Sequence, residues 1–203
     1  MTAHPPESIP EETYVDLVQA TLAALAKKGY ANLRVRDIDA ESNKSRQLIN
    51  HYFSGKDELV TETLSVLIEA VKEELDSTSN GDPTKKLNEE IDRALLGTGE
   101  EDEEFWTTTA ALYELQSQAQ HNPHHREMFN EFLDLQVNHF STIIQEGIDQ
   151  GVFNEVDSYR MANAIDDLIV GATVKKIHLG RDDAPLETRE MIDELVMSEL
   201  NPK

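Results

Sequence analysis

The sequence predicts an all-α protein of about nine helices. In every long segment the apolar residues recur with the roughly 3.6-residue period of an amphipathic helix, and no segment shows the alternation typical of a β-strand. Short stretches rich in Gly, Pro, Asn and Asp, such as "STSNGDP", "GTGEED" and "GRDDAP", separate the periodic segments. The 203 residues are enough for one ordinary domain, or for a small module joined to a larger one.

The first helix is predicted to begin near Ser8 and to end at Gly29. Ser8 and Glu11 have the spacing of a capping box, and Pro10 is tolerated in a first turn. The apolar positions of this segment, including Leu17, fall on one face of the helix.

Two short helices are predicted next, joined by a tight turn at residues 43–44. The first covers about residues 35–42 and turns Val35 and Ile38 inward. Ser45 is a good N-cap for the second. Offsets of three and four residues place three apolar side chains of the second helix on one face, which we expect to pack inward: Ile49, Tyr52 and Phe53.

The rest of the chain is predicted to form longer helices. Ser54 and Asp57 have the spacing of another capping box, and a stripe that begins at Val60 and Leu64 and reaches Leu75 predicts a long fourth helix. The remaining helices are predicted over about residues 83–96, 103–120, 123–150, 157–179 and 186–200.

The charge is distributed unevenly along the chain. The formal net charge is -22, yet residues 27–56 contain seven Lys or Arg and three Asp or Glu, which gives +4. A positive segment in such a protein is a candidate anion-facing surface, although an ordinary mixed surface helix has the same composition. The acids of the later segments are interpreted as a hydrated coat suited to a cell interior of molar salt, or as a patch for a basic partner.

Polar side chains on the third predicted helix have the chemistry of a DNA reader. Gln47 and Asn50 can pair with adenine N6 and N7, and Arg46 can pair with guanine O6 and N7. Two short helices joined by a tight turn are the layout of a helix-turn-helix, although three-helix modules of this size also occur without DNA.

The stretch "KKGYANLRVRDIDAESNKSRQLINHYFSGKDELV" resembles the TetR-type (tetracycline-repressor-type) transcriptional regulators. The resemblance is carried by Gly29 and Tyr30, by "VRDI" at 35–38, by Ser45 and by "HYFSGKDEL" at 51–59. The looser "EGIDQGVF" at 146–153 is similar to the end of the family's seventh helix. The candidate DNA-binding residues are Arg34, Arg36, Lys44, Ser45, Arg46, Gln47, Leu48, Asn50, His51 and Lys56.

The chain also departs from the family's usual pattern. Ser42, Asn43 and Lys44 stand where the family usually has Ala-Gly-Val, Asn50 replaces a Tyr that touches the DNA backbone in many members, and Asp39 replaces a common Ala. The contact pattern on DNA is therefore open. Leu48 could join the core, or could meet a thymine methyl in the groove.

The resemblance implies a homodimer in which the last two helices of each subunit form a four-helix interface. Apolar stripes on these helices fit that interface or, alternatively, the core of one subunit. The candidate dimerisation residues are Ala162, Ile165, Leu168, Ile169, Ala172, Met191, Leu195 and Val196.

In the family, the middle helices enclose a small-molecule cavity, and ligand binding changes the spacing of the two DNA readers. A ligand can do this only if it prefers one spacing. The apolar candidates for lining such a cavity, each of which could equally be plain core, are Phe105, Trp106, Tyr113, Met128, Phe129, Phe132 and Phe140.

No metal site, cofactor or catalytic constellation is indicated. His121, His124 and His125 cluster in "HNPHH", but their spacing matches no well-defined zinc pattern, and we expect an exposed, partly charged helix start. Cysteine, a Gly-rich phosphate loop and H-E-x-x-H are all missing, so the chain is not expected to be an enzyme.

We expect a sequence-specific, DNA-binding transcriptional regulator, a repressor released by a small and largely apolar ligand. Residues 1–56 would form the helix-turn-helix domain and residues 57–203 the helical ligand-binding and dimerisation domain. The alternative is a dimeric helical binding or interaction module without specific DNA recognition. A cytoplasmic location is expected, since no signal peptide is apparent and no apolar run approaches the roughly 18 residues that span a bilayer.

Overall fold

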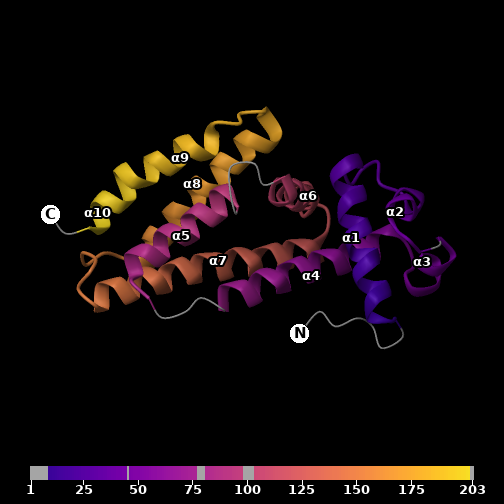
Figure 1. Ribbon diagram of the computed structural model, residues 1–203, viewed down its shortest axis with the longest axis horizontal. Coiled ribbons are helices and arrows are strands. Elements are labelled where there is room, and N and C mark those ends of the chain that lie inside the picture. Colours follow the sequence, from indigo (N-terminus) through magenta and orange to yellow (C-terminus); the bar gives the residue numbers. More distant parts are fainter. Residues whose placement is uncertain (1–8, 45, 77–80, 98–102, 202–203) are drawn as a thin grey trace. The chain divides into compact units, whose positions relative to one another are not determined.

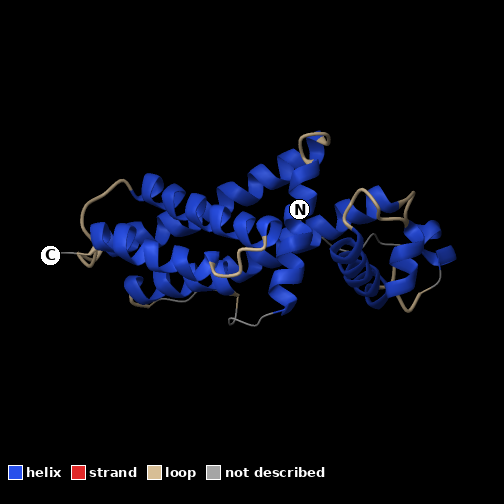
Figure 2. Ribbon diagram, turned by 90° about the horizontal axis from the view of Figure 1, so that it is seen from above, coloured by secondary structure: helices blue, strands red, loops and turns tan. Residues whose placement is uncertain are grey.

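The computed structural model describes residues 9–44, 46–76, 81–97 and 103–201, and helices with short connections account for all of them (Figures 1 and 2). In these ranges the predicted all-α fold and its nine helices are confirmed, the ninth continuing through a π-helical turn. None of the described helices is long and apolar enough to cross a membrane. The elements are α1 (Glu11–Lys28), α2 (Val35–Glu41), α3 (Arg46–Tyr52), α4 (Lys56–Asp76), α5 (Pro83–Leu96), α6 (Glu103–Gln118), α7 (Pro123–Asp149), α8 (Ser158–Leu179), α9 (Ala184–Ile192), η1 (Asp193–Met197) and α10 (Ser198–Leu200).

Helix boundaries follow the prediction more closely than helix caps do. Pro10 is the N-cap of α1, so it precedes the first turn in which it was predicted to lie. The predicted cap, Ser8, lies outside the described residues. The predicted pairing of Ser54 with Asp57 is wrong. The Ser54 amide and hydroxyl both donate to Glu58 Oε2 at 2.6 Å, since Asp57 is engaged elsewhere.

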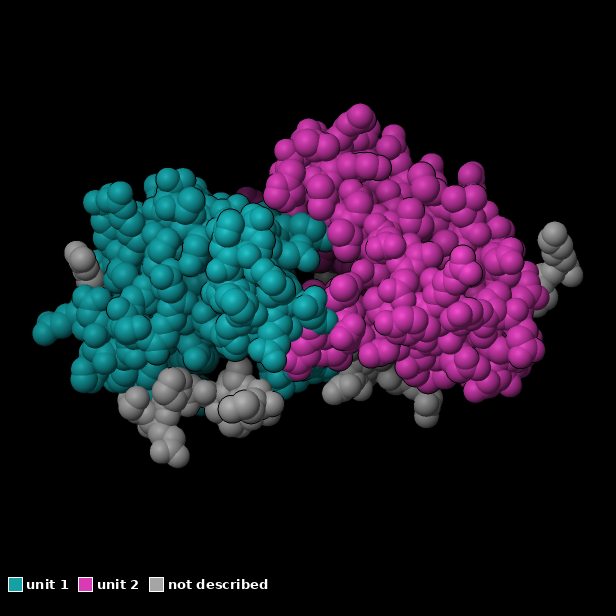
Figure 3. Space-filling view, turned by 180° about the vertical axis from the view of Figure 1, so that it is seen from behind, with its two compact units in different colours: residues 1–77, 106–130 teal, residues 78–105, 131–203 magenta. Residues whose placement is uncertain are grey.

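The chain forms two compact units (Figure 3). Unit 1 consists of Met1–Ser77 and Trp106–Asn130, and unit 2 of Thr78–Phe105 and Glu131–Lys203. Unit 1 therefore contains the helix-turn-helix segment together with most of α6 and the first two turns of α7. These units follow the packing of the chain, and the functional boundary between residues 56 and 57 stays a prediction.

The core of unit 1 lies where α1 packs against α2 and α4. Leu17 and Leu25 on α1, Ile38 on α2 and Leu64 on α4 are all almost fully buried. Burying an apolar side chain of this size contributes about 1.5–3 kcal/mol, so these contacts hold the short helices in place. Neither α2 nor α3, at seven residues each, would be stable as an isolated helix.

The core of unit 2 is formed by apolar faces of α5, α7, α8 and the α9–α10 segment. Its largest fully buried members include Leu87, Ile91 and Leu95 on α5 and Ile143 on α7. The helices α8 and α9 pack against each other, and both pack against α5.

The end of α7 explains the stretch "EGIDQGVF" in physical terms. The amides of Val152 and Phe153 both donate to the Gly147 carbonyl, at 2.9 and 3.0 Å, which folds the chain back on the helix. The buried Phe153 ring then lies directly on Gly147, where an added Cβ would be 2.1 Å from Cδ2 of the ring. Only glycine leaves room for this ring.

Replacing Gly147 by Ala is expected to destabilise the protein by about 2–4 kcal/mol, because a buried aromatic ring has to move. Thermal and urea unfolding measure the loss. Gly55→Ala is the matched control, since nothing lies within 4 Å of the added methyl group there. Its effect should stay below about 1 kcal/mol. Equal melting temperatures for the two variants would contradict this account of the turn.

Candidate nucleic-acid interface

The short helix α3 is divided into a buried face and an exposed face. Ile49 and Phe53 are 0% and 4% exposed, as predicted, whereas Tyr52 is only half-buried. On the other side Gln47 and Asn50 are exposed. The apolar face fixes the helix to the domain, so the polar face is held outward and is free to meet a partner.

The turn before α3 is tied to α1 by Asp16. The Ser42 hydroxyl donates to one Asp16 oxygen at 2.5 Å, and the Asn43 side-chain amide donates to the other at 3.2 Å. The hydrogen bond from Ser42 is the main reason that the pKa of Asp16 is lowered. Within the turn, the Lys44 amide donates to the Ser42 hydroxyl at 2.9 Å.

These contacts account for the departure of Ser42, Asn43 and Lys44 from the apolar pattern of the family. An Ala-Gly-Val turn would be held by apolar contact, whereas here a carboxylate on α1 accepts hydrogen bonds from two polar side chains. Hydrogen bonds to a charged group contribute about 1.5–3 kcal/mol, comparable to one buried apolar side chain. The polar turn therefore keeps the helix-turn-helix geometry by a different interaction.

Tyr30, just after α1, fixes the start of α4. Its hydroxyl donates to Asp57 Oδ1 at 2.8 Å, and its carbonyl accepts a bond from Lys56 Nζ at 2.8 Å. The Lys56 ammonium also lies 4.3 Å from the centre of the Tyr30 ring. Partial burial and the bond to Asp57 raise the pKa of Tyr30 to about 12, so the phenol remains a donor at neutral pH.

A second contact of Tyr30 reaches α6. Its amide donates to Glu114 Oε1 at 2.9 Å, and the same carboxylate lies against Gly29. Neither Glu114 nor Asp16 was among the residues singled out from the sequence. Each is one acid among 40 in the chain, and pattern alone does not mark the few that are aimed at a backbone amide or a turn.

The structure places the predicted DNA-binding residues in three groups. Those exposed to solvent are Arg34, Arg36, Gln47, Asn50 and His51. Those half-buried are Lys44, Leu48 and Lys56. Ser45 and the side chain of Arg46 lie outside the described residues.

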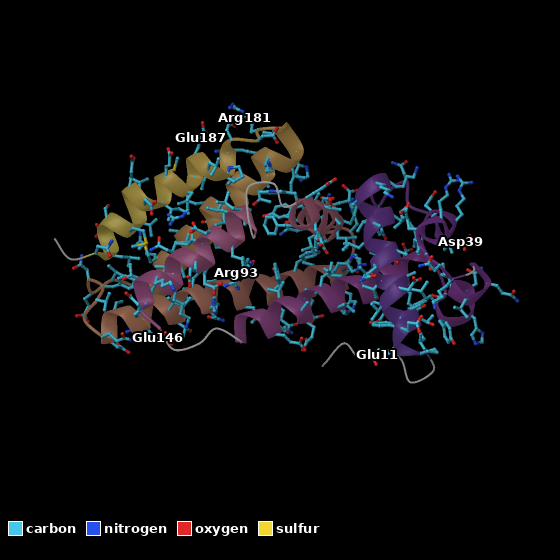
Figure 4. The ribbon with its side chains drawn as sticks, viewed as in Figure 1. Glu11, Asp39, Arg93, Glu146, Arg181 and Glu187 are labelled. Carbon is cyan, nitrogen blue, oxygen red and sulfur yellow. The ribbon has the colours of Figure 1, made fainter. Side chains whose placement is uncertain are left out.

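Two of the half-buried lysines are engaged within the domain. Lys44 lies 3.5 Å from Glu12 on α1, and Lys56 is held by Tyr30. The exposed Arg36 is 3.9 Å from Asp37, a distance at which a surface pair contributes little. Arg36 can therefore turn to a phosphate at low cost, whereas Lys56 would first have to leave Tyr30. Asp39, labelled on α2 in Figure 4, reduces the positive potential of this surface.

Comparisons with known proteins agree with this geometry. The model of the N-terminal domain of the bacterial regulatory proteins of the tetR family matches residues 17–63, a span that begins in α1, contains α2 and α3 and ends in α4. A TetR transcription regulator from Haloarcula marismortui is 26% identical, with a TM-score of 0.85 over 95% of this chain and 100% of that chain. Residues 17–63 therefore match the N-terminal domain of the tetR family, and the chain as a whole has the fold of a TetR transcription regulator.

More distant relatives fit the same assignment. The HTH-type transcriptional regulator YfiR of Bacillus subtilis (strain 168) is 22% identical over 91% of this chain and 83% of its own length. A transcriptional regulator from Saccharomonospora viridis, solved in complex with choline, shares the fold with a TM-score of 0.82 and 19% identity, over 96% of this chain and 100% of that chain. The family and its relatives are DNA-binding regulators and not enzymes.

In the cluster "HNPHH", one of the three histidines is buried although all three were predicted to be exposed. His121 and His124 are exposed, as expected, but His125 is 1% exposed and its Nε2 lies 2.9 Å from the Thr61 hydroxyl of α4. Burial lowers the pKa of His125, so the expectation of an exposed, charged residue was wrong there. Among the described residues, no group of three or more His, Asp or Glu side chains could hold a metal ion.

The candidate dimerisation residues fall into two classes. A single subunit already encloses Ala162, Ile165, Ile169, Ala172 and Val196. Side chains enclosed by their own subunit have no surface left to contact a second subunit. These five residues are therefore assigned to the subunit core, which was the alternative interpretation of the stripe. Met191 and Leu195 are 42% and 62% exposed, and Leu168 is half-buried.

The candidate ligand-lining residues belong to both units. Phe140 is buried in the core of unit 2 and Phe129 is buried in unit 1. The Phe105 ring lies against Gly97 at the end of α5, where an added Cβ would be 2.6 Å from it. The half-buried candidates are Phe105, Trp106, Tyr113, Met128 and Phe132.

A double-mutant cycle on Asp16 and Ser42 tests the polar tether of the turn. Asp16→Ala and Ser42→Ala should each cost about 1–2 kcal/mol of unfolding free energy, with a coupling of about 1 kcal/mol in the double variant. The pKa of Asp16 is lowered in the folded state, so the coupling should be present above the ordinary value of 3.8 and be lost as the pH falls through the lowered value. Urea titrations at several pH values measure it, with the exposed Asp134→Ala on α7 as control. Strictly additive effects would show that the contact does not hold the turn.

Proposed function

We propose that the regulator binds a double-stranded DNA operator as a homodimer and represses transcription until a small molecule releases it. The observation that supports this most strongly is the division of α3. Ile49 and Phe53 anchor the helix, and Gln47 and Asn50 are presented to solvent. A helix held in this way has the shape and chemistry needed to enter a major groove.

In this proposal the exposed side chains have distinct roles. Gln47 and Asn50 read base edges, since each can form two hydrogen bonds with an adenine. Arg46 at the start of α3 would pair with a guanine or a phosphate, while Arg34, Arg36 and His51 would contact the backbone of the duplex. Lys44 and Lys56 act mainly within the domain, where they hold the turn and the start of α4.

The exposed apolar side chains support a dimer formed through α8 and α9. Most of the large hydrophobic residues exposed in the described chain lie on these two helices and η1 or directly beside them: Tyr159, Val174, Leu179, Leu186, Met191 and Leu195. Large apolar side chains exposed on one pair of helices are typical of an interaction site in a protein that otherwise carries a large negative charge. Gly171 adds open space where another helix can approach.

Ligand release is the least direct part of the proposal. It rests on the partly buried aromatic residues of the middle helices and on two proteins of similar fold, the Saccharomonospora viridis regulator with choline and the regulator FadR of Bacillus subtilis with stearoyl-CoA. FadR is 21% identical, with a TM-score of 0.67 over 90% of this chain and 97% of that chain. Proteins of this fold therefore bind ligands of very different chemistry.

The acidic surface is proposed to be a hydrated coat that keeps the regulator soluble in a salt-rich cytoplasm. From residue 61 onward the chain contains 11 basic and 31 acidic residues, and they are spread over every helix. In high salt, attraction to phosphate is weak, because counterion release contributes less to binding. Base contacts from α3 would then supply most of the affinity.

Selection of bound fragments from random DNA is expected to recover a two-fold symmetric site. Gln47→Ala and Asn50→Ala should each weaken binding to it by about 1–3 kcal/mol, because base contacts are lost, and should leave non-specific binding unchanged. Gln116→Ala on α6 and Asn130→Ala on α7, both exposed, are the matched controls. Titrations across salt concentrations should show a shallow slope. Failure to recover any preferred sequence would refute the proposal.

Leu195→Glu is expected to convert the dimer to a monomer, because a charge would enter the apolar contact between subunits. The dissociation constant of the dimer should rise about tenfold or more, as is usual when one central interface residue is replaced. Sedimentation equilibrium measures the association, and Leu133→Glu on α7 is the matched control, since Leu133 is also exposed, at 42%. An unchanged dimer in Leu195→Glu would place the interface elsewhere.

A further inference from the structure

One buried acid of unit 2 has no partner. Asp166, in the middle of α8, is 5% exposed. No hydrogen bond or ion pair joins its carboxylate to another residue in the described part of the chain. Its neighbours one turn away on the buried face, Ala162 and Ile169, are apolar. An isolated buried carboxylate is costly unless something supplies the missing charge or hydrogen bonds.

Glu90 shows how unit 2 treats a buried acid that is part of its own framework. It is also 5% exposed, but Arg93 lies 2.9 Å from one carboxylate oxygen and His139 lies 3.6 Å from the other. Burial alone would raise the pKa of Glu90, yet His139 and Arg93 together hold it below its usual value. Asp166 has no such compensation, so its structural role is not that of Glu90.

The other buried polar residue of α8 offers an acceptor and no donor. Thr173 lies seven residues further along α8, two turns away on the same face and about 10 Å along the axis. Its hydroxyl proton is already donated to the Ile169 carbonyl at 2.9 Å, so only lone pairs remain. A helix face with a carboxylate and a hydroxyl whose proton is already donated repels anions and favours a positive group.

The carboxylate is buried without being sealed. The fully enclosed side-chain atoms that have no hydrogen-bond partner in the described chain are Nδ1 of His125 and Nε2 of His139. The oxygens of Asp166 are not among them, although they also lack a partner, so they retain a small contact with solvent.

The raised pKa of Asp166 is consistent with a site that binds a cation. Burial and the neighbouring Asp167 raise the pKa of Asp166 to about 6, so the charged form is disfavoured until an opposite charge arrives. The nearest cations along α8 do not provide it: Arg160 and Lys175 are exposed, and Lys176 lies 3.3 Å from Asp182. A bound cation would shift Asp166 to its ionised form and release a proton.

We propose that Asp166 binds the positively charged group of the regulator's effector, which makes the effector a small organic cation with an apolar body. The inference rests on the proposed function and names the ligand class of that function. Apolar residues of unit 2 would contact the body of the ligand, and Asp166 would select its charge. A quaternary ammonium and a protonated amine share this chemistry.

Isothermal titration calorimetry on the full chain tests the proposal with four probes. They are tetramethylammonium, choline, benzyltrimethylammonium and 3,3-dimethylbutan-1-ol, the uncharged carbon analogue of choline. At least one cation should bind the wild-type protein about tenfold or more tightly than the alcohol does, since a desolvated charge pair is lost in the alcohol. Methylated and unmethylated amines of equal size then distinguish the two kinds of cation.

Variants at two adjacent positions assign the effect to Asp166. Asp166→Asn should weaken cation binding about tenfold or more, and Asp166→Glu should retain most of it, because the charge is kept. The neighbouring Asp167→Asn removes the same charge from an exposed position and should change the affinity by less than about twofold. Cation binding to the wild type should weaken as the pH falls through about 6, and this pH dependence should be absent from Asp166→Asn.

Several results would overturn the proposal. They are equal binding of choline and its uncharged analogue, no binding of any cation to the wild type, and unchanged cation affinity in Asp166→Asn. Dissociation of the dimer in Asp166→Asn would show that the carboxylate serves the subunit contact instead. DNA binding is measured without any of the organic cations. A protein that binds its operator but none of these cations would therefore contradict this proposal and leave the proposed function intact. Cation binding by a protein that selects no DNA sequence fails the proposed function alone.

Discussion

The packing of one face of α3 against the core of unit 1 is the constraint on which the regulator depends. A helix of seven residues has little stability of its own, so its position is set by the buried Ile49 and Phe53. The same two residues determine which side chains remain outside. Gln47 and Asn50 point to solvent because the helix has no other way to bury its apolar face. The orientation of the DNA-reading surface is therefore a consequence of hydrophobic burial, and the polar residues on it can vary without loss of the fold.

The turn that leads into α3 shows that the same geometry can be held by different chemistry. A turn of small and apolar residues needs only packing, whereas Ser42 and Asn43 need an acceptor, and Asp16 on α1 provides it. A carboxylate that accepts two hydrogen bonds is insensitive to salt at short range, unlike a surface ion pair such as that of Lys27 and Glu41. For a chain with this much negative charge, using one acid as a structural acceptor inside the DNA-binding domain also prevents that charge from facing a phosphate.

The sequence was informative where a single local signal determines the structure. The helix α5 begins at Pro83 and ends before Gly97, and α8 ends before Gly180. The division of α3 into two faces is predicted by the helical period. It was less informative where two distant segments meet. The burial of His125 depends on α4 passing beside the first turn of α7, and no local pattern records that. The stripe on α8 mixes residues that face the subunit core with residues that face solvent, since a helix packed on two sides has an apolar surface wider than one stripe. Whether Ala162 or Leu168 belongs to the core is decided only by neighbours remote in sequence.

The compact unit that contains the DNA reader also contains the means of influencing it. Within unit 1, the Glu114 carboxylate on α6 accepts a hydrogen bond from the Tyr30 amide, and Tyr30 in turn holds Lys56 and Asp57 at the start of α4. A second contact joins His125 at the start of α7 to Thr61 on α4. A displacement of α6 or of the first turn of α7 must therefore either break these bonds or move α4 with it. Because α3 is joined to α4 by only three residues, 53–55, a shift of α4 reaches the DNA-reading helix directly.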